Sequence, residues 1–334
     1  MYVLNIDLLQ LGDIILSRSA EPLSAFVRRQ SNSNYSHAAL VVADNSCVES
    51  TGDGVHAETL QRLGFETEND ALVLRLQTPA SIADLDTSMN FARTKVGTDY
   101  ASRSEVTRSY SGSATYAQEQ NRQYCTRLVA QAYAAAGIAL VANADYCTPG
   151  DIEQSALLKV VPNCLVEANK EQEEWVREAE RGESITITQA SITSNFLEQV
   201  QQLTDLDLQT LEQVDSYLAA DQTYDSQIAE LLTQSGYLGI GDEEKRSNPW
   251  FYDLAEFEKQ GNEQHRYDFA QGQEFSEAVR SHAYSKAAQA YQQQAQALQS
   301  SYFTVMANCA ARQYELSQER MKVWQATIAS YLPF

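Results

Sequence analysis

The chain has 334 residues, 43% of them hydrophobic, and is therefore long enough for two domains of ordinary size, each with a buried core. Its formal net charge of -21 argues against non-specific binding to nucleic acid or to anionic lipid, since both depend on clustered Lys and Arg. The 5 cysteines form no CxxC pair, so the sequence predicts neither a disulfide framework nor a metal site, and we expect no cofactor.

A signal peptide begins with a basic region followed by an apolar stretch, and the N-terminal residues Met1–Asp7 do not show this pattern. No later window approaches the roughly 20 apolar residues that a membrane-spanning helix needs. We therefore expect no membrane span, synthesis in the cytoplasm, and any export by a route that needs no signal peptide.

Short strands and a few helices are predicted in the first 164 residues. The turn at Gly12-Asp13 leads into the first clear strand. Gly137 follows the last apolar position of a helix, where a C-cap favours glycine. The expected strands are 11–17, 37–43, 46–50 and 71–76, and the expected helices are 21–30, 81–96 and 125–136.

The composition changes near Cys164. Residues 1–164 carry 18 acids against 12 bases, whereas residues 165–334 carry 27 against 12 and are rich in Gln. Apolar residues recur at helical spacing near 165–181, 191–203, 207–219 and 224–234, and residues 274–331, without Gly or Pro, are typical of one or two very long helices. We therefore predict a first domain at 1–164 and an acidic, Gln-rich helical domain at 165–334. No cluster of ligands or nucleophiles occurs in the second domain, which favours a structural bundle.

Cys125 stands at the front of the predicted helix 125–136. The positive end of a helix macrodipole and the unpaired N–H groups of a first turn favour thiolate over thiol. Leu128, Val129 and Tyr133 belong to the buried stripe of this helix, so the cysteine is carried on a rigid element. Taken alone, a cysteine in such a position is more often buried and inert.

His37 stands at the start of a predicted strand and could act as the general base for a nearby thiol. Glu49, in the adjacent strand, could orient the imidazole, with Glu58 as the reserve. If the turn at 44–45 has two residues, Glu49 points to the face opposite His37. A three-residue turn or a bulge would place both side chains on one face.

The remaining histidines and cysteines show no comparable pattern. None of the histidines has a convincing partner. For the two in the helical part, His265 and His282, we expect surface or packing roles, and for the cysteines we expect small core positions. These residues are His56, His265 and His282, and Cys47, Cys147, Cys164 and Cys309.

Five short motifs follow one another along the chain. They are Gly12-Asp13-Ile14-Ile15; Tyr35-Ser36-His37-Ala38-Ala39-Leu40-Val41; Val48-Glu49-Ser50 with Gly54-Val55 and Leu60; Tyr124-Cys125-Thr126-Arg127-Leu128-Val129; and Thr148-Pro149-Gly150-Asp151-Ile152 with Ser155. In this combination and order they resemble the circularly permuted NlpC-type papain-like cysteine hydrolases, the YiiX-like branch. The resemblance covers about residues 1–160, and the His precedes the Cys, the reverse of the order in unpermuted relatives.

The resemblance implies an α+β fold, with a small antiparallel sheet and a nucleophile helix, and it implies roles for individual residues. Cys125 would be the nucleophile, His37 the general base and Glu49 the orienting residue. Tyr100, or alternatively Tyr124, would help to bind the developing oxyanion.

Members of this superfamily commonly cut cell-wall peptides, so the resemblance implies a cysteine amidase or endopeptidase acting on peptidoglycan stem peptides. A wall-cutting enzyme made in a bacterial cytoplasm without a signal peptide suggests a type VI style antibacterial effector, delivered to the periplasm of a target cell. The helical domain would then bind a delivery or immunity protein. The alternatives are a lipid acyl hydrolase or acyltransferase of the same superfamily, against which the absence of an amphipathic basic helix argues, and a binding module on a papain-like scaffold.

Overall fold

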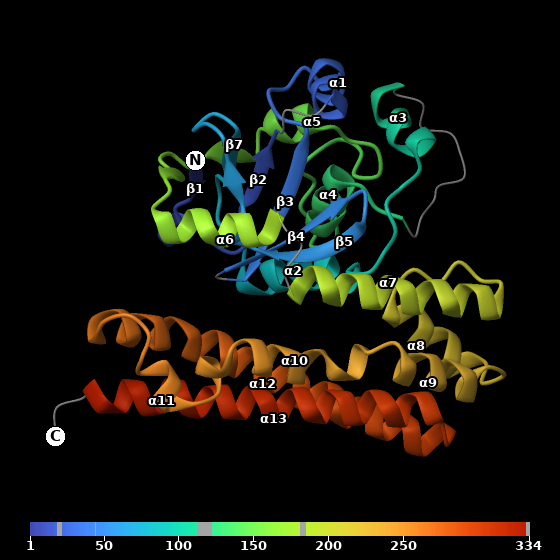
Figure 1. The fold of residues 1–334 in the computed structure, drawn as a ribbon. Helices are drawn as coiled ribbons and strands as arrows, with labels where there is room; N and C mark the ends of the chain where they lie inside the picture. Colours follow the sequence, from blue (N-terminus) through green and yellow to red (C-terminus); the bar gives the residue numbers. More distant parts are fainter. Residues whose placement is uncertain (19–21, 44, 112–121, 181–184, 332–334) are drawn as a thin grey trace. The chain divides into compact units, whose positions relative to one another are not determined.

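The computed structural model describes residues 1–18, 22–43, 45–111, 122–180 and 185–331 (Figure 1). The chain divides into two compact units, an N-terminal unit of Met1–Leu197 with Asp207–Glu212, and a C-terminal unit of Glu198–Leu206 with Gln213–Phe334. This division differs from the predicted boundary at residue 164. One reason is that β9, Leu165–Glu167, pairs with β1, Tyr2–Leu4, so the chain just after residue 164 still belongs to the N-terminal unit.

The N-terminal unit is built around a six-stranded antiparallel sheet with the strand order β5-β4-β3-β2-β7-β8. The central strand β3 has the sequence HAALVVA, an almost continuous apolar run, because both of its faces are covered. The strands of this sheet are β2 Ile14–Ser17, β3 His37–Ala43, β4 Ser46–Thr51, β5 Gly54–Thr59, β7 Ala71–Leu76 and β8 Leu158–Val160.

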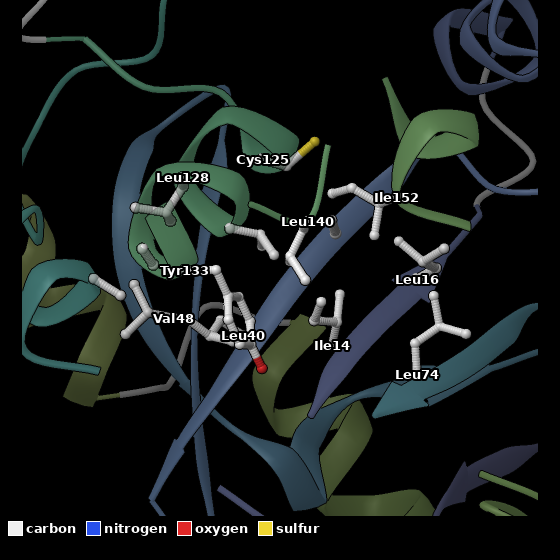
Figure 2. Packing of buried hydrophobic residues seen from close by; sticks show 14 of the residues in the cluster. Ile14, Leu16, Leu40, Val48, Leu74, Cys125, Leu128, Tyr133, Leu140 and Ile152 are labelled. Atoms are coloured by element: carbon white, nitrogen blue, oxygen red, sulfur yellow. The ribbon is translucent and has the colours of Figure 1, made fainter. Parts of the chain in front are cut away.

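Alternate residues of the central strands contribute to two separate apolar clusters. Ile14 and Leu40 pack with Leu128 and Tyr133 of helix α4, Cys125–Ala135, as Figure 2 shows. Their sequence neighbours Ile15, Ala39 and Val41 belong to a second cluster, together with Leu4 and Leu60. The period of two along each strand therefore gives the sheet one apolar layer on each face.

A smaller, three-stranded sheet has the order β6-β1-β9. The prediction of a helix near 165–181 is wrong at its start. Residues 165–167 form a strand that pairs with β1, and the helix α6 begins only at Lys170. A strand of three residues is too short for a period of two to be recognised in the sequence. The remaining strand of this sheet is β6, Gly64–Phe65.

The helices of the N-terminal unit begin and end at recognisable signals. Thr148 caps α5 in a reciprocal capping box with Asp151, and Gly137 adopts a φ of 76° just after α4. A Cβ at Gly150 would stand 2.0 Å from the Ser31 carbonyl oxygen, so only glycine lets α5 approach the end of α1 this closely. The helices are η1 Ile6–Leu8, α1 Pro22–Ser31, η2 Leu60–Arg62, α2 Ile82–Thr94, α3 Arg103–Ser111, α4, α5 Pro149–Glu153 and α6 Lys170–Glu180, followed by α7 Ile185–Thr204, which continues into the second unit.

The C-terminal unit is helical, and its two longest helices, α12 and α13, lie side by side (Figure 1). Between them the buried Arg320 guanidinium donates to both carboxylate oxygens of buried Glu277 at 3.0 and 2.9 Å. The described elements are α8 Leu211–Ala220, α9 Asp225–Gln234, η3 Tyr237–Gly239, α10 Ile240–Ser247, η4 Pro249–Phe251, α11 Leu254–Phe257, α12 Glu263–Leu298 and α13 Ser301–Tyr331. The predicted fold class, antiparallel sheets with a nucleophile-bearing helix followed by long C-terminal helices, is confirmed. Among the helices that the structure describes, none combines the length and the apolar character required to cross a bilayer.

Candidate active site

The register between β3 and β4 places Glu49 on the same face as His37. Glu49 lies opposite Ala39, which is two residues after His37, and the pairing shifts between Val41 and Ala43. This irregularity is the bulge that the sequence required, because a regular two-residue hairpin would have turned Glu49 to the other face. Asp44, in the predicted turn, lies outside the described residues.

The Glu49 carboxylate contacts the His37 ring directly. The distance from His37 Nε2 to Glu49 Oε2 is 2.5 Å, and the Glu49 side chain is only 11% exposed. Burial acts to raise the pKa of Glu49, but the hydrogen bonds and charges of His37 and of a second histidine, His56, outweigh burial and hold this pKa well below its usual range. Glu49 is therefore an anion that can orient an imidazolium.

Cys125 begins α4 and is 7% exposed, with its sulfur drawn at the N-terminal end of that helix in Figure 2. Its thiol interacts with the His37 side chain. Burial acts to lower the pKa of His37, yet the bonds to Cys125 and Glu49 and the Glu49 charge raise it well above its usual value. The structure thus brings all three predicted residues into one chain of contacts, from Cys125 to His37 to Glu49.

The two candidate tyrosines have different surroundings. Tyr124 is the N-cap residue of α4, is 2% exposed, and donates its hydroxyl to the Asp145 carbonyl at 2.8 Å. Tyr100 forms a parallel bridge with Gln123, two residues before the thiol. The hydroxyl of Tyr124 is engaged in holding the loop at Asp145.

The reserve candidate Glu58 lies further along the same face. It is opposite Cys47 on the neighbouring strand, and its carboxylate accepts the backbone N–H of Thr59 at 2.7 Å. Burial and the charge of Glu49 raise the pKa of Glu58. The contact with the His37 ring is made by Glu49.

His56 is the residue that the sequence interpretation missed. It lies directly opposite Glu49 on β5, and its Nε2 is 3.2 Å from Glu49 Oε1. The signal that could have found it is the two-residue turn at Gly52-Asp53, because a turn of that length sets the register that brings positions 49 and 56 together. Among the described residues, no group of three or more His, Cys, Asp or Glu is arranged to hold a metal ion.

Replacing Glu49 by glutamine tests whether the carboxylate orients and charges His37. Without the anion, His37 loses its proton at a lower pH, so the alkaline limb of the activity profile should move down by about 1 to 3 pH units. Activity near neutral pH should fall by roughly 10²- to 10⁴-fold, as when the carboxylate of a triad becomes an amide.

The control is Glu58→Gln, whose activity should fall by less than about tenfold. A larger loss in Glu58→Gln than in Glu49→Gln, measured as kcat/KM against pH, would transfer the orienting role to Glu58.

Comparison with known proteins gives a family match for the N-terminal part of the chain. Residues 8–144 match the family model described as permuted papain-like amidase enzyme, YaeF/YiiX, C92 family. Among solved structures, the chain is similar to the crystal structure of the metalloprotein yiiX from Escherichia coli O157:H7, with 20% sequence identity and a TM-score of 0.37, over 46% of this chain and 96% of that chain. None of the curated proteins matches the sequence. The resemblance predicted from the five motifs is thus confirmed over residues 8–144, which match the permuted papain-like amidases of the YaeF/YiiX type, and this match supports a cysteine-type hydrolase in general.

Proposed function

We propose that the N-terminal unit is a cysteine amidase that cleaves an amide bond in peptidoglycan stem peptides, with Cys125 as the nucleophile. The observation that supports this most is the chain of contacts from the thiol to His37 and from His37 to the Glu49 carboxylate. A thiol next to an imidazole, with a carboxylate that orients the imidazole, is the arrangement that acyl transfer through a thioester requires.

The raised pKa of His37 favours an imidazolium paired with the Cys125 sulfur. The Cys125 thiolate attacks the amide carbonyl, a C–S bond forms, and the oxyanion is placed near the N–H groups of the first turn of α4. The C–N bond then breaks as His37 donates its proton to the leaving amine. Neutral His37 next takes a proton from water, whose oxygen bonds to the acyl carbon, and departure of the thiolate restores the pair.

A surface depression of about 620 Å³ supports a peptide substrate that carries carboxylates. Its lining includes Arg28 and Arg29 of α1, together with Asn34 and Glu153. Asn34 is three residues before His37, so the depression lies within about 11 Å of the His37 backbone along the chain. In a chain with a formal net charge of -21, two adjacent arginines at this place favour a substrate anion, and stem peptides carry free carboxylates.

Digestion of purified peptidoglycan by the full chain, followed by mass spectrometry of the released muropeptides, tests the proposal. We expect new fragments that differ from the parent peptides by hydrolysis of one amide bond, and none with Cys125→Ala. If wall fragments are unchanged while fatty acid is released from phospholipid vesicles, the substrate is a lipid and the proposal is wrong.

The effector role is a further part of the proposal and is supported by the C-terminal unit. That unit has its own aromatic core around Phe257 and Trp324 and its own buried ion pair, so it can present a surface independently of the catalytic unit. Its acidic composition suits a basic partner, such as a delivery or immunity protein. Export of the chain to the periplasm of a test bacterium should be toxic, and equal toxicity of the Cys125→Ala form would remove the enzymatic basis of this role.

A further inference from the structure

A second histidine shares the carboxylate that orients His37. His56 Nε2 is 3.2 Å from Glu49 Oε1, whereas His37 Nε2 is 2.5 Å from Glu49 Oε2. Each oxygen of the carboxylate therefore faces one imidazole. The strand register fixes this arrangement, since His56 is directly opposite Glu49 and His37 is diagonal to it across β3 and β4.

Both ring nitrogens of His56 face oxygens that can only accept. Nδ1 is 3.3 Å from the Gly54 carbonyl oxygen, and Nε2 faces the anionic Glu49 carboxylate. A neutral imidazole has a single N–H, so it can satisfy only one of these two acceptors, whereas an imidazolium satisfies both. His56 is 9% exposed, so leaving one of the two contacts unmade would be costly.

The charged groups around His56 also favour a positive ring. Glu49 faces it from β4, and Glu58 lies two residues further on the same face of β5, opposite Cys47. Burial acts to lower the pKa of His56, but the bond to Glu49, the charges of Glu49 and Glu58 and the bond to the Gly54 carbonyl raise it. Two other cationic groups act on the same carboxylates: His37 contacts the other oxygen of Glu49, and the charge of Arg62 acts on Glu58.

We propose that His56 is a positioning residue of the active site, held as an imidazolium that fixes the Glu49 carboxylate and offsets part of its negative charge. This inference rests on the proposed function only in giving His37 and Glu49 their catalytic roles. Because a positive charge on one side of Glu49 competes with His37 on the other, His56 tunes how strongly His37 retains its proton. The site thus contains a second imidazole that never has to touch the substrate.

The charge of His56 can be read without any substrate. The chain contains 4 histidines, so ¹⁵N-histidine labelling of the full protein gives a spectrum simple enough to assign with single substitutions. At pH 7.5 we expect both nitrogens of the His56 ring to be protonated. A His56 ring with one unprotonated nitrogen at that pH would overturn the proposal, whether or not the protein cleaves cell-wall peptides.

The variant His56→Gln tests the coupling to His37. Its side-chain amide can still donate to Glu49 but carries no charge, so the titration of His37 should move upward by about 0.5 to 1 pH unit, and the alkaline limb of kcat/KM should move with it. His282→Gln, the same change at an exposed position of α12, should leave both unchanged. An unmoved His37 titration in folded His56→Gln would show that His56 serves only packing.

Discussion

Cys125→Ala is expected to lose amide hydrolysis by about 10⁴-fold or more, because the thioester intermediate cannot form without the thiol. The substitution removes one sulfur at the N-terminal end of α4, where the side chain is 7% exposed, so the fold should be retained. The measurement is the rate of new amine release from purified stem peptides. Circular dichroism of the same samples checks that the variant is folded.

Cys164→Ala is the matched control, since it removes a thiol that is 3% exposed but belongs to the apolar cluster on the other face of the sheet. It should keep most of its activity and lose some stability. Iodoacetamide should modify Cys125 faster than Cys164, because Cys125 interacts with the His37 ring, whereas burial raises the pKa of the Cys164 thiol. Activity in Cys125→Ala within tenfold of the parent would exclude a covalent mechanism at this residue.

The positions of His37, Glu49 and Cys125 could be predicted because each lies at a local signal: the start of a strand, the next strand of a hairpin, and the front of an amphipathic helix. Even the need for a bulge between His37 and Glu49 follows from the period of two along a strand. The contacts of His56 can be predicted only if the turn that joins β4 to β5 is recognised. They depend on the register of β4 and β5, which propensities leave open by one residue in either direction.

The other features that the sequence did not reveal depend on pairing over long distances in the chain. β1 and β9 have three residues each, and their pairing joins the first residues to position 165 and moves the unit boundary toward Leu197. A three-residue strand is stabilised by its partner rather than by its own pattern. Long helices such as α13, by contrast, repeat their apolar period often enough to be recognised from local sequence.

The second large effect is expected at Arg127, two residues after the thiol. Its guanidinium donates to the Glu105 carboxylate at 2.7 Å, to the Asp145 carbonyl at 2.8 Å and to the Arg122 carbonyl at 3.1 Å. Arg127 is 2% exposed and Glu105 1%, and the Tyr146 hydroxyl donates to the same Glu105 oxygen. These bonds connect α4 to α3 and to the segments on either side of Cys125, so Arg127 holds the thiol in place without facing substrate.

Arg127→Ala should therefore destabilise the N-terminal unit by about 3 to 5 kcal/mol, because it leaves the buried Glu105 carboxylate without its cation. Arg177→Ala, on α6, removes an ion pair to Glu173 in which the arginine is 52% exposed, and should cost about 0.2 to 1 kcal/mol. Hydrogen exchange of peptides from 122–147 during urea titration measures the loss of stability in the segment that contains Cys125 and Arg127.

In the double variant Arg127→Met with Glu105→Gln, part of the lost stability should return. The unpaired charge is then absent, while the contacts to the two carbonyl groups stay unmade. Equal costs for Arg127→Ala and Arg177→Ala would mean that water reaches the Glu105 carboxylate, and that this pair does not fix the segment before Cys125.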